Sequence, residues 1–251
     1  MEGDFIKQCR RSPFLQNPTA NMGFDLCLIN CLINISNMIQ NASVSERPRG
    51  RPVDADQQDL KIRILDTAES LFSNHGYAAT SIRRIANRAN VNPALVHYYF
   101  GNKKALLQEV MERSLEPLGQ AIAAMKTGPG ASPELIARLM ISMAANHPNI
   151  PRLLIREVFL PGGEMQQYFA EHMAPHLGGA LPDLLSREKA AGRMRQDTDP
   201  AISALLVMAI SVFPFIARTL AEPVLGVDFD EKGIELLTQQ IADLLKHGMT
   251  L

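Results

Sequence analysis

The chain has no tryptophan, and its three cysteines (Cys9, Cys27 and Cys31) all lie within the first 31 of 251 residues. The rest of the chain therefore has no disulfide framework, which suits the cytoplasm, where we expect the protein to work. The spacing of Cys27 and Cys31 would place both on one helical face. No further ligand residues lie near them, so we predict no metal site there.

Sequence signatures of catalysis are also missing. We find no Gly-rich phosphate loop, no nucleophile elbow and no zinc-hydrolase motif. Asp228 and Asp230 form a carboxylate pair without a nearby base, and His172 and His176 lack a third metal ligand. We therefore predict no enzyme activity, no cofactor and no bound metal.

A membrane span is not predicted either. The most apolar stretch, residues 22–40, is short and interrupted by Asp25, Asn30, Asn34 and Asn37. It also lacks the clean apolar core and small-residue cleavage site of a signal peptide. The simplest hypothesis is that translation begins later, at Met22 or Met38. The first 46 residues are then a disordered or mis-started extension.

What the chain does have is apolar residues at helical spacing, which make up much of its 46% hydrophobic content. An all-α fold is therefore predicted. The net charge of −1 hides an asymmetry. Residues 47–104 hold ten Lys/Arg against five Asp/Glu, a net of +5, whereas residues 105–251 hold twelve against seventeen, a net of −5. A basic module followed by an acidic one is typical of a DNA-binding domain joined to a domain that does not bind DNA. The alternative is that surface charge is scattered by chance.

Residues 80–104 predict two short helices separated by a tight turn. Thr80 is suited to cap the first helix. Asn90 tolerates the left-handed backbone that such a turn needs, and Asn92 can cap the second helix with Pro93 in its first position. Gly101 then ends the second helix.

This layout is typical of a helix-turn-helix, in which the second helix enters the major groove. Lysines at the start of the next helix make sense if a phosphate lies beside them. The alternative is a small helical domain with solvated lysines and packed aromatics. The candidate DNA contacts are Thr80, Arg83, Asn92, Pro93, Ala94, His97, Tyr98, Tyr99 and Lys103.

A basic segment precedes this module. Arg47, Arg49 and Arg51 alternate with Pro and Gly, so the segment cannot form a regular helix. Such an arm can place arginines in a narrow minor groove, or it can add nonspecific affinity through phosphates. Both interpretations stay open.

A series of landmark residues runs through the segment from Leu60 to about Val110. They are Ile64-Leu65-Asp66-Thr67-Ala68, Leu71-Phe72, Gly76-Tyr77, Thr80 to Ala86, Val91-Asn92, Tyr98 to Phe100, Lys103 and Ala105-Leu106-Leu107. With these landmarks the segment resembles the DNA-binding domain of the TetR/AcrR family. Three positions depart from the usual pattern: Asn90 replaces the turn glycine, His97 stands where Tyr is frequent, and Tyr99 stands where His is frequent. The resemblance implies a homodimeric transcriptional regulator, usually a repressor released by a small ligand.

From this we predict four parts of the chain. They are an uncertain extension (1–46), a basic arm (47–55), a helix-turn-helix domain (56–104), and a helical domain for ligand binding and dimerisation (105–251). Helices are expected at 133–146, 151–159, 164–190 with breaks at its prolines, 200–221 and 231–247.

Helices 200–221 and 231–247 are too apolar for solvent, which predicts a dimer interface on them. Burial within one subunit is the alternative. The candidates for this interface are Leu205, Val212, Leu237, Ile241 and Leu244.

A pocket for a small, largely apolar ligand is expected among the middle helices. Any one of its candidates could equally be plain core. A regulator or activator without an inducer is therefore the alternative function. The pocket candidates are Met140, Met143, Phe159, Met165, Phe169, Met173, Met208 and Phe213.

Overall fold

The computed structural model describes residues 53–128 and 131–250 of the chain. The extension at residues 1–46 and the arginines of the basic arm, Arg47, Arg49 and Arg51, lie outside the described residues. The arm was predicted to reach residue 55, but the first described helix already begins at Val53.

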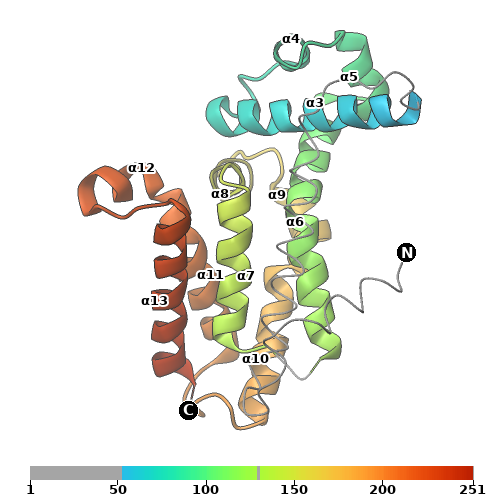
Figure 1. Cartoon of the computed structure of the whole chain (residues 1–251). Coiled ribbons are helices and arrows are strands. Elements are labelled where there is room, and N and C mark those ends of the chain that lie inside the picture. Colours follow the sequence, from blue (N-terminus) through green and yellow to red (C-terminus); the bar gives the residue numbers. More distant parts are fainter. Residues whose placement is uncertain (1–52, 129–130, 251) are drawn as a thin grey trace, which may run out of the picture. The chain divides into compact units, whose positions relative to one another are not determined.

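Three helices form the N-terminal module, which we call the reader (Figure 1). They are α3 (Val53–His75), α4 (Ile82–Arg88) and α5 (Pro93–Phe100). Their core is built from apolar side chains at helical spacing, with Phe72, Ile85 and Val96 each fully buried. The predicted helix-turn-helix over residues 80–104 is confirmed in outline.

The helix α6 (Lys103–Thr127) leaves the reader and enters the body. Asn102 caps it by accepting a hydrogen bond from the amide of Ala105 at 2.9 Å. Its buried stripe, from Leu106 to Ile122, packs on α3 at one end and on the body further along. Reader and body therefore share one continuous helix.

The body contains the remaining helical segments. The main helices are α7 (Pro133–Asn146), α8 (Ile150–Leu154), α10 (Leu181–Ala190), α11 (Pro200–Ile216) and α13 (Glu231–Met249). The shorter segments are η2 (Ile155–Phe159), α9 (Gln166–Tyr168), η3 (Phe169–Met173), η4 (Ala174–His176), η5 (Gly178–Ala180), α12 (Arg218–Leu220) and η6 (Ala221–Leu225).

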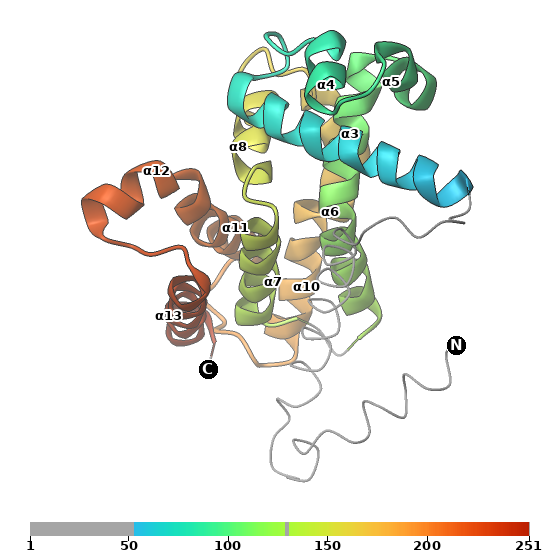
Figure 2. The same cartoon turned by 45° about the horizontal axis from the view of Figure 1, so that its top comes forward.

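In the body, α7 packs against both α11 and α13, and α10 packs against α11 (Figure 2). The described residues contain no strand, only one isolated bridge between Met194 and Thr250. The all-α prediction is therefore correct.

Prolines set most of the helix limits in the body. Pro133 and Pro200 each stand in the first turn of a helix, where a missing N–H costs nothing. The predicted segment 164–190 is broken into short turns around Pro175 and the glycines at 178–179 before α10 begins. The expected helix 200–221 ends earlier, at Ile216, and continues as α12 and η6.

Among the described residues, no helix is by itself both long and apolar enough to cross a membrane. The bent pair Pro200–Ile216 and Arg218–Leu225, which meet at 51°, reaches that length and composition only when the two are joined.

Candidate nucleic-acid interface

The turn between α4 and α5 has the predicted geometry. Asn90 is the single described non-glycine residue with a positive φ, at 54°. The Asn92 side chain accepts a hydrogen bond from the Ala94 amide at 2.9 Å, and Pro93 occupies the first helical position. These residues fix where α5 starts and therefore which of its side chains face outward.

The outward face of α5 carries Ala94, His97 and Tyr98, which are exposed and lie three and four residues apart. Tyr98 has 78% of its surface exposed. The opposite face, with Val96 and Phe100, is buried in the reader core. A short, rigid helix therefore presents a small, a heterocyclic and a phenolic side chain to solvent.

Thr80 corrects the sequence prediction. Its side chain is fully buried, and its hydroxyl donates to the Leu71 carbonyl at 3.2 Å, so it cannot contact DNA from this position. The cap of α4 is Ser81 instead, whose hydroxyl accepts from the Arg84 amide at 3.1 Å. The cap was placed one residue too early because Thr and Ser are both favoured cap residues and stand next to each other in the sequence.

Two other candidates are less exposed than predicted. Pro93 is half-buried, and so is Tyr99, which packs against the core and stands edge-on to Tyr98 with ring centroids 5.3 Å apart. Tyr99 therefore supports the position of the Tyr98 ring, and part of its own ring remains exposed.

Lys103 is held inside the reader. Its ammonium donates to the Tyr77 carbonyl at 2.9 Å and lies 4.0 Å from the centre of the Tyr77 ring. An ammonium has three donors, so others stay available for a phosphate. Its neighbour Lys104 pairs with Glu164 of the body at 3.1 Å.

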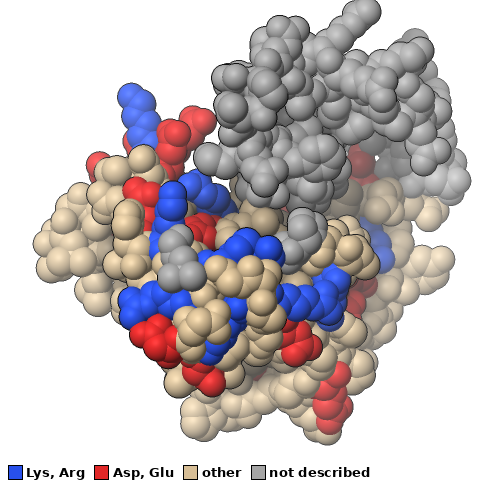
Figure 3. Space-filling model, turned by 90° about the horizontal axis from the view of Figure 1, so that it is seen from below, with Lys and Arg blue, Asp and Glu red and all other residues tan. Residues whose placement is uncertain are grey.

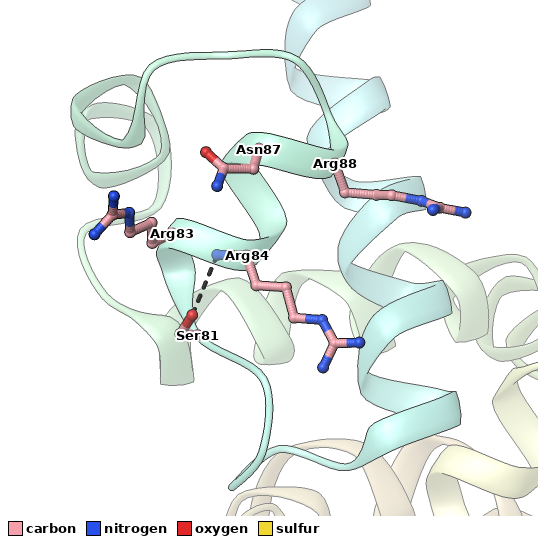
Figure 4. A pocket seen from close by; sticks show the side chains of 5 residues that line it. All are labelled: Ser81, Arg83, Arg84, Asn87 and Arg88. Atoms are coloured by element: carbon pink, nitrogen blue, oxygen red, sulfur yellow. Dashed lines mark hydrogen bonds between the residues drawn. The ribbon is translucent and has the colours of Figure 1, made fainter.

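The sequence prediction missed most of a basic hollow on α4 (Figure 4). The side chains of Arg84 and Arg88 extend to one side of the helix, and Arg83 with the Asn87 amide extends to the other. All are exposed, opposite the buried Ile85 and Ala86. The four-residue spacing of Arg84 and Arg88 would have placed both on one face, but only Arg83 was singled out. The hollow is lined by Ser81, Arg83, Arg84, Asn87 and Arg88.

These arginines have no carboxylate partner within the part of the chain that the structure describes. Arg84 donates instead to the Nε2 atom of His75 at 2.9 Å, which requires that nitrogen to be unprotonated. At the end of the body that is farthest from the reader, by contrast, Lys and Arg side chains lie among Asp and Glu side chains (Figure 3). On α4, three arginines without a carboxylate partner among the described residues therefore lie close together in the sequence, at Arg83, Arg84 and Arg88.

The reader is attached to the body through a buried carboxylate. Glu157, on η2, accepts a hydrogen bond from the backbone amide of Tyr77 at 3.0 Å. The backbone carbonyl of Tyr77 accepts from Lys103, so side chains bind both the amide and the carbonyl of this residue. The same carboxylate faces the amide of Glu164 at 3.4 Å, and the Glu157 carbonyl accepts from the amide of Met165 at 2.9 Å. Beside it, Arg156 donates to the carbonyl of His75 at 3.3 Å.

A second buried carboxylate joins the two parts, but here the carboxylate belongs to the reader and a donor belongs to the body. Glu69 of α3 accepts from the Ser114 hydroxyl at 3.1 Å and lies 3.4 Å from the Asn149 amide nitrogen. His147 is near, and burial lowers its pKa, while the Glu69 charge acts in the other direction. Each part thus supplies one buried carboxylate to the other.

The predicted pocket residues divide into three groups. Met140, Met165 and Met173 are buried in the core. Phe159 and Phe213 are corrections, since each is 63% exposed and so lies at the surface of this chain. The half-buried group is Met143, Phe169 and Met208.

The predicted interface residues also divide. Leu205 and Leu244 are exposed at 61% and 64%. Ile241 is a correction: it is buried within this chain, one turn from the buried Leu245, because this stripe of α13 faces α7. Val212 and Leu237 are half-buried. Other large exposed apolar side chains on these helices are Ile202, Leu206, Phe213 and Leu236.

Comparisons with known proteins agree with this architecture. The family of bacterial regulatory proteins called tetR matches residues 64–110, and the tetracyclin repressor-like C-terminal domain matches residues 133–248. A transcriptional repressor of Streptomyces coelicolor, SCO4008, is 32% identical over 47% of this chain and 64% of its own length. The chain thus spans under two thirds of that relative.

The repressor NicS of Pseudomonas putida is 26% identical over 72% of this chain and 87% of its own length. Among solved structures, SmeT in complex with triclosan has a TM-score of 0.60 at 21% identity, covering 77% of this chain and 92% of that one. Because the matched families cover both the reader and the body, and the solved structure shares the fold, the chain belongs to the TetR/AcrR family of transcriptional regulators.

Proposed function

We propose that this regulator is a homodimeric repressor that binds a pseudo-palindromic operator and is released by a small, largely apolar ligand. The observation that carries the DNA-binding part is the outward face of α5 beside the arginines of α4. A helix that projects Ala94, His97 and Tyr98 fits a major groove, and cations without carboxylate partners suit the flanking phosphates.

In this arrangement Arg83, Arg84 and Arg88 hold phosphates, and Lys103 adds a donor from the start of α6. The basic arm adds Arg47, Arg49 and Arg51 from the N-terminal side. Ala94 and His97 meet base edges, with Asn92 and Tyr98 reaching bases or phosphates. Two copies of α5 would occupy successive major grooves, about 34 Å apart.

Dimerisation would use the apolar side of α11 and α13. Ile202, Leu205 and Leu206 lie on exposed turns of α11, and Leu236 and Leu244 lie two turns apart on α13. A monomeric protein rarely exposes so many large apolar side chains on two helices, and a second copy would cover them symmetrically.

Ligand binding is supported by one polar atom within the body. The Ser211 hydroxyl of α11 is fully buried and has no hydrogen-bond partner among the described residues. A buried hydroxyl without a partner is unfavourable, so a polar atom of a ligand there would relieve it. Met143 and Met208, both half-buried, can adapt to the apolar remainder of such a ligand.

Release would pass through the junction at Glu157. The backbone of Met165, a pocket candidate, is bonded to Glu157, and Glu157 is bonded to Tyr77, which also holds Lys103. A ligand that favours a different position of η2 would therefore move a proposed phosphate contact, and DNA affinity would fall.

The alternative is a regulator or activator that needs no inducer. Full burial of Met165 and near-full burial of Met140 and Met173 favour it, because these side chains fill the body without a ligand.

The DNA-binding proposal is tested by titrating the protein on its own upstream DNA across a salt series with scrambled competitor. We expect saturable binding that survives competitor and weakens steeply with salt. Binding that competitor removes at equal concentration would contradict an operator-reading role.

The ligand proposal is tested with triclosan, the apolar aromatic compound that SmeT holds. Triclosan should raise the melting temperature and weaken operator binding, and Ser211→Ala should reduce both effects. A library of apolar compounds that leaves melting temperature and DNA affinity unchanged would favour the inducer-free alternative.

A further inference from the structure

His97 is the side chain on the outward face of α5 whose hydrogen-bonding character the fold fixes. Its Nδ1 atom lies 2.9 Å from the Gly101 carbonyl oxygen. A carbonyl oxygen only accepts, so Nδ1 carries the hydrogen and donates it. The same two residues are joined a second time, since the Gly101 amide donates to the His97 carbonyl at 2.8 Å.

The position of that carbonyl follows from the end of the helix. Gly101 has a φ of 73°, in the left-handed region that glycine adopts without strain, and this turn directs its carbonyl back toward His97. Local backbone geometry, and not a flexible neighbour, therefore selects the tautomer of the ring.

A neutral ring with its hydrogen on Nδ1 has an acceptor at Nε2. Within residues 53–128 and 131–250, Nε2 of His97 has no hydrogen-bond partner, and the side chain is exposed. The other polar groups nearby are different: Arg83 only donates, and the Tyr98 hydroxyl does both. While the ring is neutral, Nε2 of His97 therefore acts only as an acceptor.

Only two groups in the major groove donate hydrogen bonds: the N4 amino group of cytosine and the N6 amino group of adenine. Guanine presents two acceptors there, and thymine presents an acceptor and a methyl group. We propose that Nε2 of His97 accepts from one of these amino groups, so that it selects adenine or cytosine over guanine or thymine on the strand it faces. This inference rests on the proposed DNA-binding function.

The resulting preference has an unusual form. His97 would select bases that present an amino group in the major groove over bases that present a keto group. It would therefore accept A·T and C·G pairs in one strand orientation and reject both pairs in the other orientation. An arginine at this position would instead favour guanine, because it only donates.

The test is selection from a randomised double-stranded DNA library at pH 8 by wild-type protein, His97→Phe and His97→Arg. Wild-type protein should enrich adenine and cytosine at one position of each half-site, by roughly fivefold to tenfold over guanine and thymine. His97→Phe should lose this preference at that position only, and His97→Arg should change it to guanine.

Two results would overturn the inference while leaving the proposed function intact. One is an unchanged base profile for His97→Phe; the other is an equal loss of affinity for all sequences, which would make His97 a phosphate contact. If wild-type protein enriched nothing, the proposed DNA-binding function would fail and the inference with it.

The premise has a readout of its own that needs no DNA. Nitrogen-detected NMR of the free protein at pH 8 should show His97 with its proton on Nδ1. A ring protonated on Nε2 would remove the acceptor and refute the inference even if His97 proved to affect the base profile.

Discussion

Two surfaces of this regulator remain unsatisfied in the folded chain, and they differ in kind. On α4, three arginines line a hollow with no carboxylate partner among the described residues. On α11 and α13, large apolar side chains such as Leu205 and Leu244 are more than half exposed. The first surface suits a polyanion and the second suits another apolar surface.

The difference shows how one chain can use separate surfaces for two kinds of association, one driven by charge and one by apolar contact. Charge without a partner attracts DNA over several ångströms and weakens with salt, whereas apolar contact is short-ranged and largely indifferent to salt. Substitutions on the two surfaces should therefore have different signatures.

The largest effect is expected from charging the apolar surface. Leu205→Glu combined with Leu244→Glu should convert a dimer into a monomer, because each copy would bury two carboxylates at a symmetric interface. Operator affinity should fall at least about 100-fold, since one reader then binds without its twin. Sedimentation and DNA titration measure the two changes.

The matched control is Leu160→Glu, an exposed leucine that is part of neither helix, at 52% exposure. It should leave mass and affinity unchanged. If the double variant remained a dimer of full affinity, the interface would lie elsewhere.

A smaller effect is expected on the basic surface. Arg84→Ala combined with Arg88→Ala should weaken binding to operator and scrambled DNA alike, by roughly tenfold, and reduce the salt slope by about 2. Fluorescence anisotropy at several salt concentrations measures both. Arg195→Ala is the control, because Arg195 pairs with Asp197 in the body at 2.6 Å. A loss confined to operator DNA would make these arginines readers of bases instead.

Much of the reader followed from local rules. Asn90, Asn92 and Gly101 each fix a backbone conformation by their own chemistry, so the turn and both ends of α5 could be predicted from their neighbours. The predicted helix 133–146 likewise has the limits of α7. Thr80 shows where such rules stop, because both adjacent residues are favoured caps. The buried hydrogen bond of the Thr80 hydroxyl to the Leu71 carbonyl leaves Ser81 as the cap.

Long-range pairing could not be predicted. Glu157 is far from Tyr77 in sequence, and nothing near either residue indicates that a carboxylate would meet a backbone amide. Ile241 and Leu244 have similar apolarity and lie three residues apart, yet one faces α7 and the other faces solvent. Which stripe of an apolar helix is inward depends on the neighbouring helix, and a single sequence does not contain that information.

A third prediction concerns the junction that separates the two surfaces. Glu157→Gln should reduce the free energy of unfolding by roughly 1–3 kcal/mol, because one buried acceptor of a two-amide site becomes a donor. Urea denaturation measures it, and hydrogen exchange at the Tyr77 amide should accelerate. Glu164→Gln, at a partly exposed carboxylate paired with Lys104, is the control and should cost under about 1 kcal/mol. Equal costs for the two variants would mean that the Tyr77 contact contributes nothing.

The smallest effect is a pH dependence at the second buried carboxylate, Glu69, whose charge acts on His147. Burial lowers the pKa of His147 in the folded protein from its ordinary value of 6.5. As pH falls, the unfolded chain gains this proton first, so the stability contribution present above about pH 6.5 declines as the pH falls toward the folded pKa. Urea denaturation between pH 7.5 and 5 should show a shallower decline for His147→Asn than for wild-type protein. The exposed-site control His176→Asn should follow the wild-type curve. If His147→Asn also followed it, the half-buried ring would be gaining its proton as readily when folded as when unfolded, and the contact between Glu69 and the body would not sense pH.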